Sequence, residues 1–379
     1  MNIGIVCYPT FGGSGVVATE LGKALASKGH KVHFISYDQP ARLDYFSQNL
    51  FYHEVTVSTY PLFQYPPYEL ALTGKIIEVV QSAHLDILHV HYAIPHAAAA
   101  VMAKKILRDM NGISIPVITT LHGTDITLVG KDPNYEGVVS YSLNQSDSIT
   151  SVSASLREDT FRFFRIHKPI EVIPNFIDLE KYTRPLNCDY RNAFALDDEF
   201  ILMHTSNFRK VKRIEDVITI FDNVNKQKPS KLILAGDGPE RRSMEIICQE
   251  LGIEDRVFFL GKQDNIEKIL PIGDVFLMPS ETESFGLAAL EAMACGVPVV
   301  CSNTGGMPEL NRQGFSGFIA DVGDTNIMTE HVLTILKSKE SLQTFRTQAR
   351  EHATQFATEN IVPLYEKLYF SLINKSNLK

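Results

Sequence analysis

A cluster of four basic residues is the first feature that could do chemistry. Arg209, Lys210, Lys212 and Arg213 lie within five positions, although the chain carries a formal net charge of −8. They follow a predicted strand and precede a helix expected to begin near residue 213. Cations at a helix N-terminus oppose the macrodipole unless an anion lies among them. A phosphate held by Arg209, Lys212 and the helix end resolves that conflict; the alternative is a solvated helix start.

A second chemical signal lies in residues 281–300, where two glutamates accompany a helix expected to begin near Phe285. Free N–H groups at a helix start can bind a phosphate, and Glu283 and Glu291 can accept hydrogen bonds from sugar hydroxyls. Eight residues separate the two glutamates, which in one continuous helix places them near the same face. The alternative is a pair of solvated carboxylates.

A glycine-rich loop, residues 12–15, joins the first predicted strand to a helix and lets backbone amides approach an anion. Gly13, Gly15 and Ala18 also satisfy a dinucleotide-binding fingerprint, with Asp38 after the next strand. An NAD-type turn has its first glycine almost at the strand end, whereas here four residues intervene. We favour a ligand-contacting loop; an NAD site and a purely structural turn remain as alternatives.

Histidines gather near two further strand ends. His89, His91 and His96 fall within eight residues, but His96 lies beyond a turn and no Cys or carboxylate accompanies them. We therefore predict packed or hydrogen-bonded imidazoles rather than a metal site. His122 lies in Leu-His-Gly-Thr-Asp, directly after another strand. Open α/β sheets bind ligands at that edge, so we favour a site there over a plain turn.

Residues 161–168 form another basic stretch, interleaved with aromatic residues. The stretch ends a predicted helix, where cations interact favourably with the helix dipole. We interpret it as structural, and a membrane-facing surface is the alternative.

The elements that must position these residues alternate along the chain. Short Val- and Ile-rich runs separate longer helical patterns, which is typical of βαβ units and buried parallel sheets. In the first half we predict strands at 3–7, 31–36, 51–58, 86–90, 115–120, 148–152 and 170–173. Helices are predicted at about 14–28, 68–83, 95–110, 135–145 and 153–165. This half is expected to be one doubly wound domain.

A second alternation begins after a polar stretch that ends near residue 199. Strands are predicted at 200–204, 231–235, 256–260, 274–278 and 297–301, with helices at about 213–226, 239–251, 265–270 and 285–295. Closing helices are predicted at 324–338, 340–356 and 360–375. We predict an N-terminal domain at 1–172, a C-terminal domain at 173–357, and a last helix at about 358–379 that packs back on the first domain.

Composition narrows the class of protein. The 36 basic against 44 acidic residues argue against a bulk nucleic-acid or anionic-membrane binder. Five scattered cysteines without a CxxC pair indicate neither a disulfide framework nor a zinc site and suit a reducing cytoplasm. No signal-peptide pattern or membrane-spanning apolar run is present. We expect a soluble, unprocessed cytoplasmic protein without stable membrane insertion; the sequence leaves open whether it forms a homo-oligomer.

Several motifs together resemble the retaining glycosyltransferases of family 4. These are Gly-Asp-Gly-Pro-Glu at 236–240, the helix segment with Glu283 and Glu291, and Thr-Gly-Gly-Met-Pro-Glu at 304–309. The glycine loop, the His122 segment, Ile-Pro-Asn-Phe-Ile-Asp at 173–178 and the basic cluster follow the family's order, so the resemblance covers essentially the whole chain. It implies the GT-B fold, in which two doubly wound Rossmann-like domains face each other across a cleft.

Within this family, segments 7–15, 63–72, 89–100, 119–127 and 206–213 are most similar to members that transfer N-acetylglucosamine from UDP-N-acetylglucosamine to L-malate in bacillithiol biosynthesis. That resemblance makes the first domain acceptor-binding and the second UDP-sugar-binding. It implies four catalytic residues: Arg209, Lys212, His122 and Glu283. The implied donor-binding residues are Gly13, Asn207, Gly238, Leu260, Gly261, Phe285, Gly286, Leu287 and Glu291. The implied acceptor-binding residues are Ser14, Tyr92 and Thr120, and Arg157 is a further cation available to a dicarboxylate.

The mechanism that the resemblance implies is a same-face displacement, in which the β-phosphate of departing UDP takes the proton of the malate hydroxyl. The chain contains no Asp-x-Asp pair, so we expect the cations to stabilise the leaving group and no obligatory metal or other cofactor to be needed. Three alternatives remain. They are a family 4 enzyme with another acceptor such as a lipid-linked sugar, a UDP-sugar epimerase, and a non-catalytic UDP-sugar sensor.

Overall fold

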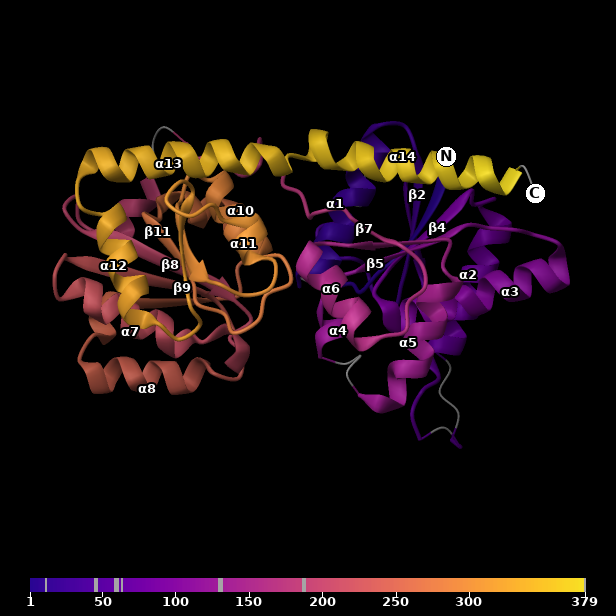
Figure 1. The fold of residues 1–379 in the computed structure, drawn as a ribbon, viewed down its shortest axis with the longest axis horizontal. Coiled ribbons are helices and arrows are strands. Elements are labelled where there is room, and N and C mark those ends of the chain that lie inside the picture. The colour runs from indigo at the N-terminus through magenta and orange to yellow at the C-terminus, as the bar shows by residue number, and fades with distance from the viewer. Residues whose placement is uncertain are drawn as a thin grey trace. The chain divides into compact units, whose positions relative to one another are not determined.

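The computed structural model describes residues 1–10, 12–43, 47–57, 61–62, 64–128, 132–185 and 189–377. The chain divides into two compact units. Unit 1 contains residues 1–176 together with the chain from Thr358 onward, and unit 2 contains Ile177–Ala357 (Figure 1). Phe11, Phe63 and Cys188, which belong to predicted motifs or to the cysteine count, lie outside the described residues.

Unit 1 is built on a seven-stranded parallel sheet with the order β3-β2-β1-β4-β5-β6-β7. Its strands are β1 (Asn2–Val6), β2 (Lys31–Ser36), β3 (Leu50–Glu54), β4 (Ile87–His91), β5 (Val117–Leu121), β6 (Ser148–Ser151) and β7 (Ile170–Val172). The central strands β4 and β5 are buried along their whole length, as expected for strands covered on both faces.

The helices of unit 1 connect these strands. They are α1 (Gly13–Ser27), α2 (Tyr68–Ser82), a π-helical turn (Ala93–Ala97) that leads into α3 (Ala98–Asn111), α4 (Thr124–Thr127), α5 (Pro133–Gln145), α6 (Ala154–Phe163) and the C-terminal α14 (Thr358–Asn377). Local sequence explains several ends: Ser153 caps α6 by accepting a hydrogen bond from the Leu156 amide, and Gly112 ends α3 with a left-handed conformation.

Unit 2 repeats the architecture with a six-stranded parallel sheet in the order β10-β9-β8-β11-β12-β13. Its strands are β8 (Phe200–Ser206), β9 (Ser230–Gly236), β10 (Val257–Gly261), β11 (Val275–Met278), β12 (Val299–Ser302) and β13 (Gly317–Ala320). Its α-helices are α7 (Ile214–Asn225), α8 (Arg241–Leu251), α9 (Ile266–Ile269), α10 (Leu287–Ala294), α11 (Met307–Leu310), α12 (Thr325–Ile335) and α13 (Lys339–Ala353), and short 3₁₀ turns include Lys210–Lys212.

Both sheets reverse their winding direction at one place. In unit 1, β1 has β2 on one side and β4 on the other, and in unit 2, β8 lies between β9 and β11. The loops that leave such neighbouring strands diverge to opposite faces of the sheet, which opens a crevice at their carboxyl ends. The fold therefore singles out the ends of β1 and β4, and those of β8 and β11, as ligand-binding positions.

The predicted alternation of strands and helices is confirmed, with differences at particular elements. The strand β13 and the short helices α4 and α11, each four residues long, were not predicted. The strand predicted at 51–58 stops at Glu54. The helices predicted to begin at 213 and 285 begin at Ile214 and Leu287 instead, each after a residue with positive φ.

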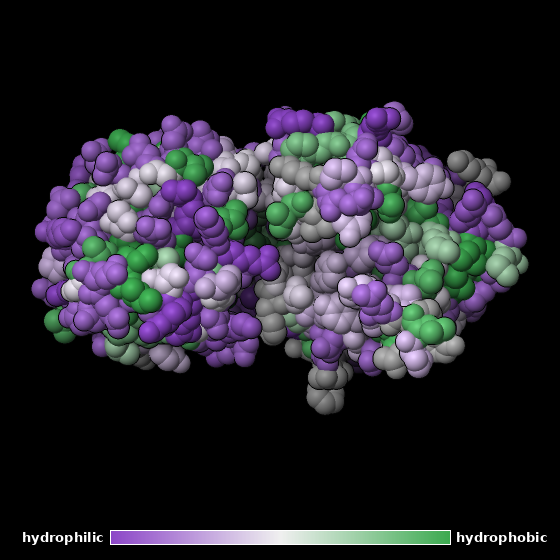
Figure 2. All heavy atoms as spheres, turned by 90° about the horizontal axis from the view of Figure 1, so that it is seen from below, coloured by the Kyte–Doolittle hydropathy of each residue, from purple (hydrophilic) through white to green (hydrophobic). Residues whose placement is uncertain are grey.

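The surface of each unit mixes polar and apolar side chains. Figure 2 shows hydrophilic residues interspersed with smaller hydrophobic areas over the visible face of both units. Among the described residues, no helix has the length and apolar character needed to cross a membrane. The four described cysteines, Cys7, Cys248, Cys295 and Cys301, are buried free thiols.

Candidate active site

The switch point of unit 2 is organised by a histidine that the sequence did not single out. His204, on β8, is fully buried and contacts the Leu277 carbonyl on β11 through Nδ1 at 2.8 Å. Its Nε2 lies 2.8 Å from the hydroxyl of Ser206, which accepts a hydrogen bond from the Phe208 amide. Burial lowers the pKa of His204 to about 4, so the neutral ring donates to the Leu277 carbonyl and accepts from Ser206. This chain of bonds fixes the loop that carries Asn207 and Arg209.

Gly236 and Gly238 let the turn after β9 pack closely against the loop that carries Asn207. A Cβ atom at Gly236 would lie 1.8 Å from the Ser206 carbonyl oxygen, and one at Gly238 would lie 2.1 Å from that of Asn207. Only glycine permits so close a backbone approach. Gly238 is therefore required by packing, and the exposed Asn207 is held beside it at the carboxyl edge of the sheet.

The four predicted cations do not act as one group. Arg213 has φ of 50°, occupies the N-cap position of α7 without a side-chain capping bond, and pairs with Asp216 in the first turn of that helix at 2.6 Å. Lys212 lies in the preceding 3₁₀ turn and pairs with Glu283, the Nζ to Oε2 distance being 2.5 Å. Within the described chain, no ion pair or hydrogen bond is found for the exposed side chain of Arg209. The four cations therefore lie directly before α7, where Arg213 pairs with the acidic first turn and Lys212 with Glu283. The phosphate expected between Arg209, Lys212 and the helix end stays a prediction.

Glu283 lies in a loop before α10 and not in the helix. The Gly306 amide donates to the Glu283 carbonyl at 2.9 Å, and a Cβ atom at Gly305 would lie 1.9 Å from that oxygen. Gly286, with φ of 96°, then turns the chain into α10. The expectation that Glu283 and Glu291 share one helix face was wrong, since only Glu291 is helical and Glu283 is instead placed by the glycine turn at 305–306.

Glu291 is held from outside its helix. It is 8% exposed, and its Oε1 accepts a hydrogen bond from the Tyr182 hydroxyl at 2.5 Å. Tyr182 lies just beyond the predicted 173–178 motif, and nothing in the local sequence indicates this partner. The bond orients the carboxylate of Glu291 in the middle of α10.

Except for Gly13, which begins α1 in unit 1, the remaining predicted donor-binding residues lie at strand and helix ends of unit 2. Phe285 is buried and packs edge-on against Phe356, while Gly286 and Leu287 form the N-terminus of α10, which has no side-chain cap. Such an uncapped start leaves backbone N–H groups available to an anion. Leu260 and Gly261 end β10, and the Leu260 carbonyl accepts a hydrogen bond from Gln263 at 2.6 Å.

In unit 1 the glycine loop lies at the switch point beside β1. The helix α1 begins at Gly13, and its first turn has neither an acidic residue nor a side-chain cap. A Cβ atom at Gly15 would lie 2.4 Å from the Thr10 carbonyl oxygen, so the loop folds tightly over the helix start. Ser14 is half-buried in that first turn. The free amides and the Ser14 hydroxyl are thus donors at an uncapped helix end.

Tyr92 follows β4 across the same switch point and is held firmly. Its φ is 90°, its hydroxyl lies 2.6 Å from the Thr124 hydroxyl, and its ring stacks on that of His122 with 5.8 Å between centroids. The carboxylate of the buried Asp125 accepts hydrogen bonds from the amides of Ala93 and Gly123 at 3.0 and 2.8 Å. Asp125 therefore ties the loops after β4 and β5 together and places Tyr92 next to His122.

Thr120 does not reach this surface. It is fully buried, and its hydroxyl lies 2.6 Å from both His89 Nε2 and the Thr150 hydroxyl. The prediction that Thr120 contacts the acceptor is not supported by this geometry, because its position on β5 turns the side chain into the interior. His89 also contacts the Tyr369 hydroxyl on α14 at 2.6 Å. The predicted packed and hydrogen-bonded histidines are confirmed.

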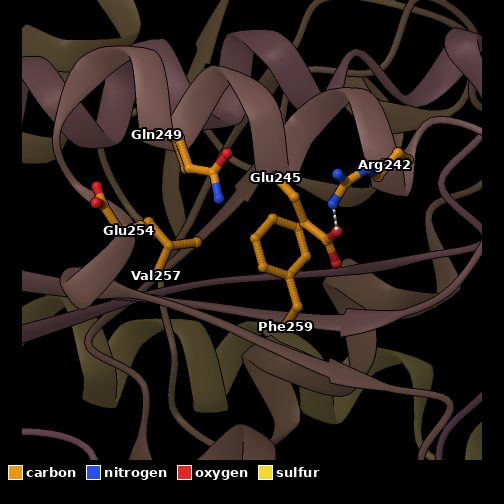
Figure 3. A pocket seen from close by; sticks show the side chains of 7 residues that line it. Arg242, Glu245, Gln249, Glu254, Val257 and Phe259 are labelled. Atoms are coloured by element: carbon orange, nitrogen blue, oxygen red, sulfur yellow. Dashed lines mark hydrogen bonds and ion pairs between the residues drawn. The ribbon is translucent and has the colours of Figure 1, made fainter.

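A surface hollow elsewhere on unit 2 carries none of the predicted site residues. It is lined by Arg242, Glu245, Cys248, Gln249, Glu254, Val257 and Phe259, between α8 and β10 (Figure 3). Arg242 and Glu245 pair across its rim at 3.3 Å. Burial raises the pKa of the Cys248 thiol to about 11, so this sulfur is a poor nucleophile at neutral pH.

Comparison with known proteins gives the family. Residues 11–181 match the model described as Glycosyltransferase Family 4, and residues 189–352 match Glycosyl transferases group 1. The chain is 46% identical over 375 residues to N-acetyl-alpha-D-glucosaminyl L-malate synthase of Bacillus anthracis, covering 98% of this chain and 97% of that protein. It is 28% identical over 322 residues to an uncharacterized glycosyltransferase of Methanocaldococcus jannaschii, covering 81% and 80% of the two chains.

Solved structures agree on the fold. Anabaena HepE in complex with UDP-glucose superposes with a TM-score of 0.83 at 21% identity, covering 98% of this chain and all of that one. Sucrose-phosphate synthase from Thermosynechococcus elongatus gives a TM-score of 0.81 at 21% identity, covering 99% of this chain and 100% of the other. With two parallel-sheet units of this kind and a 46% identical relative over nearly its full length, the chain belongs to glycosyltransferase family 4 and has the GT-B fold.

Proposed function

We propose that this protein is a retaining glycosyltransferase that moves N-acetylglucosamine from UDP-N-acetylglucosamine to the 2-hydroxyl of L-malate. The observation that carries the proposal is the 46% identity to N-acetyl-alpha-D-glucosaminyl L-malate synthase, which extends over 98% of this chain. The residues at the two switch points supply the chemistry that such a transfer needs.

The donor binds through unit 2. Arg209 and Lys212 meet the diphosphate of UDP, and the free amides at Phe285, Gly286 and Leu287 add hydrogen bonds at the start of α10. The exposed guanidinium of Arg209 is available for a phosphate. The ammonium of Lys212 is already fixed by Glu283 at 2.5 Å, so it is positioned before the ligand arrives.

Sugar hydroxyls of the donor are held by carboxylates. Glu283 accepts hydrogen bonds from hydroxyls of the transferred sugar, and Glu291 accepts a hydrogen bond from the ribose. The Tyr182 hydroxyl already donates to Oε1 of Glu291. Gly13, Asn207, Gly238, Leu260 and Gly261 line the donor with backbone and small side chains. Among them, Gly238 is required by the close approach of the Asn207 backbone.

The acceptor binds through unit 1. The uncapped start of α1 provides amides for a carboxylate of malate, and Ser14 and Tyr92 provide hydroxyls. Thr120 does not contact the acceptor directly. It supports the acceptor site from the interior, on β5, where its hydroxyl contacts His89. His122, stacked against Tyr92, contacts the transferred sugar.

The reaction is a displacement on one face of the sugar. The bond from the anomeric carbon to the β-phosphate oxygen breaks, the malate 2-oxygen forms the new bond to that carbon, and its proton passes to the released β-phosphate. Arg209 and Lys212 stabilise the negative charge that grows on UDP as it leaves. We propose that these cations replace a metal ion, so that no metal or other cofactor is obligatory.

We also propose that the protein works in the cytoplasm, because its four described cysteines are buried free thiols, as suits a reducing compartment. A lipid-linked acceptor finds little support in residues 161–168. Arg162 pairs with Asp159 at 3.2 Å and Arg165 with Glu136 at 3.8 Å, so two of the cations in that stretch have acidic partners on the protein.

The test is to incubate the purified full chain with UDP-N-acetylglucosamine and to follow UDP release with L-malate, D-malate, succinate or no acceptor. The proposal predicts release that depends on L-malate and is absent with succinate, which lacks the 2-hydroxyl nucleophile. Equal release without any acceptor, or an altered sugar without transfer, would support hydrolysis or epimerisation instead.

A further inference from the structure

The side chain of His122 is hydrogen-bonded to another histidine that the proposed reaction does not use. His91, the last residue of β4, lies with Nδ1 2.8 Å from Nε2 of His122. The two rings are nearly parallel, with 5.1 Å between their centroids. Only one proton can lie between the two nitrogens if both rings are neutral, so one histidine decides the tautomer of the other.

Both rings are neutral at physiological pH. Burial, reinforced by His96, lowers the pKa of His122 to about 3. Burial, together with neighbouring histidines, lowers the pKa of His91 well below its ordinary value. The contact therefore joins two neutral imidazoles, and the question that remains is which nitrogen donates.

The surroundings of the other ring nitrogen of His91 decide which nitrogen donates. Its Nε2 is buried and has no hydrogen-bond partner among the described residues. A proton on Nε2 would be a buried donor without an acceptor, and such orphaned N–H groups are rarer in proteins than under-used acceptors. The proton of His91 accordingly lies on Nδ1 and is donated to Nε2 of His122. The proton of His122 must then lie on its own Nδ1.

The ring of His91 cannot turn freely to escape this arrangement. It stacks on His89 with 4.4 Å between centroids, and His89 is fixed by Tyr369 and Thr120, each at 2.6 Å. The backbone beside the ring is also held, because Nδ1 of His96 donates to the His91 carbonyl oxygen at 2.5 Å.

We propose that His91 is a positioning residue for the transfer reaction: it holds His122 as the tautomer protonated on Nδ1 and so presents an N–H donor to the substrate. That this N–H group donates to an oxygen of the transferred sugar rests on the function proposed above. The tautomer itself follows from the contacts of His91 alone.

The experiment reads the tautomer directly. The full-length protein is labelled with ¹⁵N-histidine, and long-range ¹H–¹⁵N correlations are recorded at neutral pH without substrate. His122→Asn assigns the signals of His122. The same spectra are taken for His91→Phe, which keeps a ring but removes the donor, and for His91→Asn, whose amide can donate from the position of Nδ1. His84→Asn, at an exposed site, is the control.

The wild type and His91→Asn are expected to show His122 protonated on Nδ1, whereas His91→Phe loses that preference. In turnover assays, we expect kcat of His91→Phe to fall on the order of 10²-fold, as for loss of one oriented donor, with the KM for malate little changed. His91→Asn should recover most of the loss.

Protonation of His122 on Nε2 in the wild type would overturn the proposal, and so would an unchanged tautomer in His91→Phe. If His91→Phe does not fold, the wild-type and His91→Asn spectra still decide the question. The spectra need no activity, so failure of the proposed transfer reaction would be seen separately, as no malate-dependent UDP release by the wild type.

Discussion

The buried histidines of unit 1 should make its stability depend strongly on pH, and His96 allows that dependence to be measured at one residue. His96 is fully buried, donates from Nδ1 to the His91 carbonyl, and packs against Tyr8 with 4.5 Å between ring centroids. Burial lowers its pKa to about 4, from 6.5 in the unfolded chain. As the pH falls, the unfolded chain binds the proton first, so stability is lost between about pH 6.5 and pH 4.

The size of the effect follows from that shift. From pH 7 to pH 5 the unfolded imidazole becomes almost fully protonated while the folded one stays neutral, which costs about 2 kcal/mol for this one residue. In His96→Asn the titrating group is gone, but an amide donor remains near the position of Nδ1. We therefore expect the loss of unfolding free energy between pH 7 and pH 5 to be about 2 kcal/mol smaller in His96→Asn than in the wild type.

Amide hydrogen exchange of peptides that cover β1 and β4, corrected for the intrinsic effect of pH, measures this free energy within unit 1. Comparing each protein with itself at two pH values cancels the packing lost in the variant. His84→Asn, which replaces an exposed histidine, should behave like the wild type. An identical pH dependence in His96→Asn and the wild type would refute the reasoning, because His96 would then gain no charge on unfolding.

The other predictions concern the reaction. Lys212→Ala and Arg209→Ala should each lower kcat by about 10²-fold or more while circular dichroism shows an intact fold, because each side chain stabilises the negative charge that grows on UDP. Lys210→Ala, at the exposed neighbouring position, is the matched control. Equal activity in all three variants would mean that the cluster is a solvated turn. Ser14→Ala and Tyr92→Phe should raise the KM for malate several-fold without changing UDP binding by calorimetry, and an unchanged KM in both would turn attention to Arg157. Turnover should survive EDTA, whereas activity lost in EDTA and restored by magnesium or manganese would show that a metal is needed.

The sequence predicted those parts of the fold that depend on local pattern. A strand such as β11 is recognisable because residues buried on both faces form a short apolar run. The starts of α7 and α10 were placed early, because Arg213 and Gly286 adopt left-handed conformations, and that of Gly286 meets a distant segment. Met307 in that segment lies against Gly286 closely enough to exclude a side chain there.

The candidate site was predictable in its residue types but not in its contacts. Lys212 and Glu283 were both expected to bind the donor, yet their pairing joins positions 71 residues apart. The bond from Tyr182 to Glu291 spans 109 residues and leaves no local signal. The inward turn of the Thr120 hydroxyl depends on which face of β5 it occupies, and sequence similarity alone does not reveal that a hydroxyl is already engaged by His89.

The central claim is that the sugar is transferred, with its configuration kept, to the 2-oxygen of malate. The most direct measurement is proton and carbon NMR of the product formed by the purified protein from UDP-N-acetylglucosamine and L-malate. The account predicts an α-anomeric N-acetylglucosamine joined to carbon 2 of malate, formed in step with UDP. A β-anomer, a product joined through a carboxylate, or UDP release without any sugar on malate would contradict it.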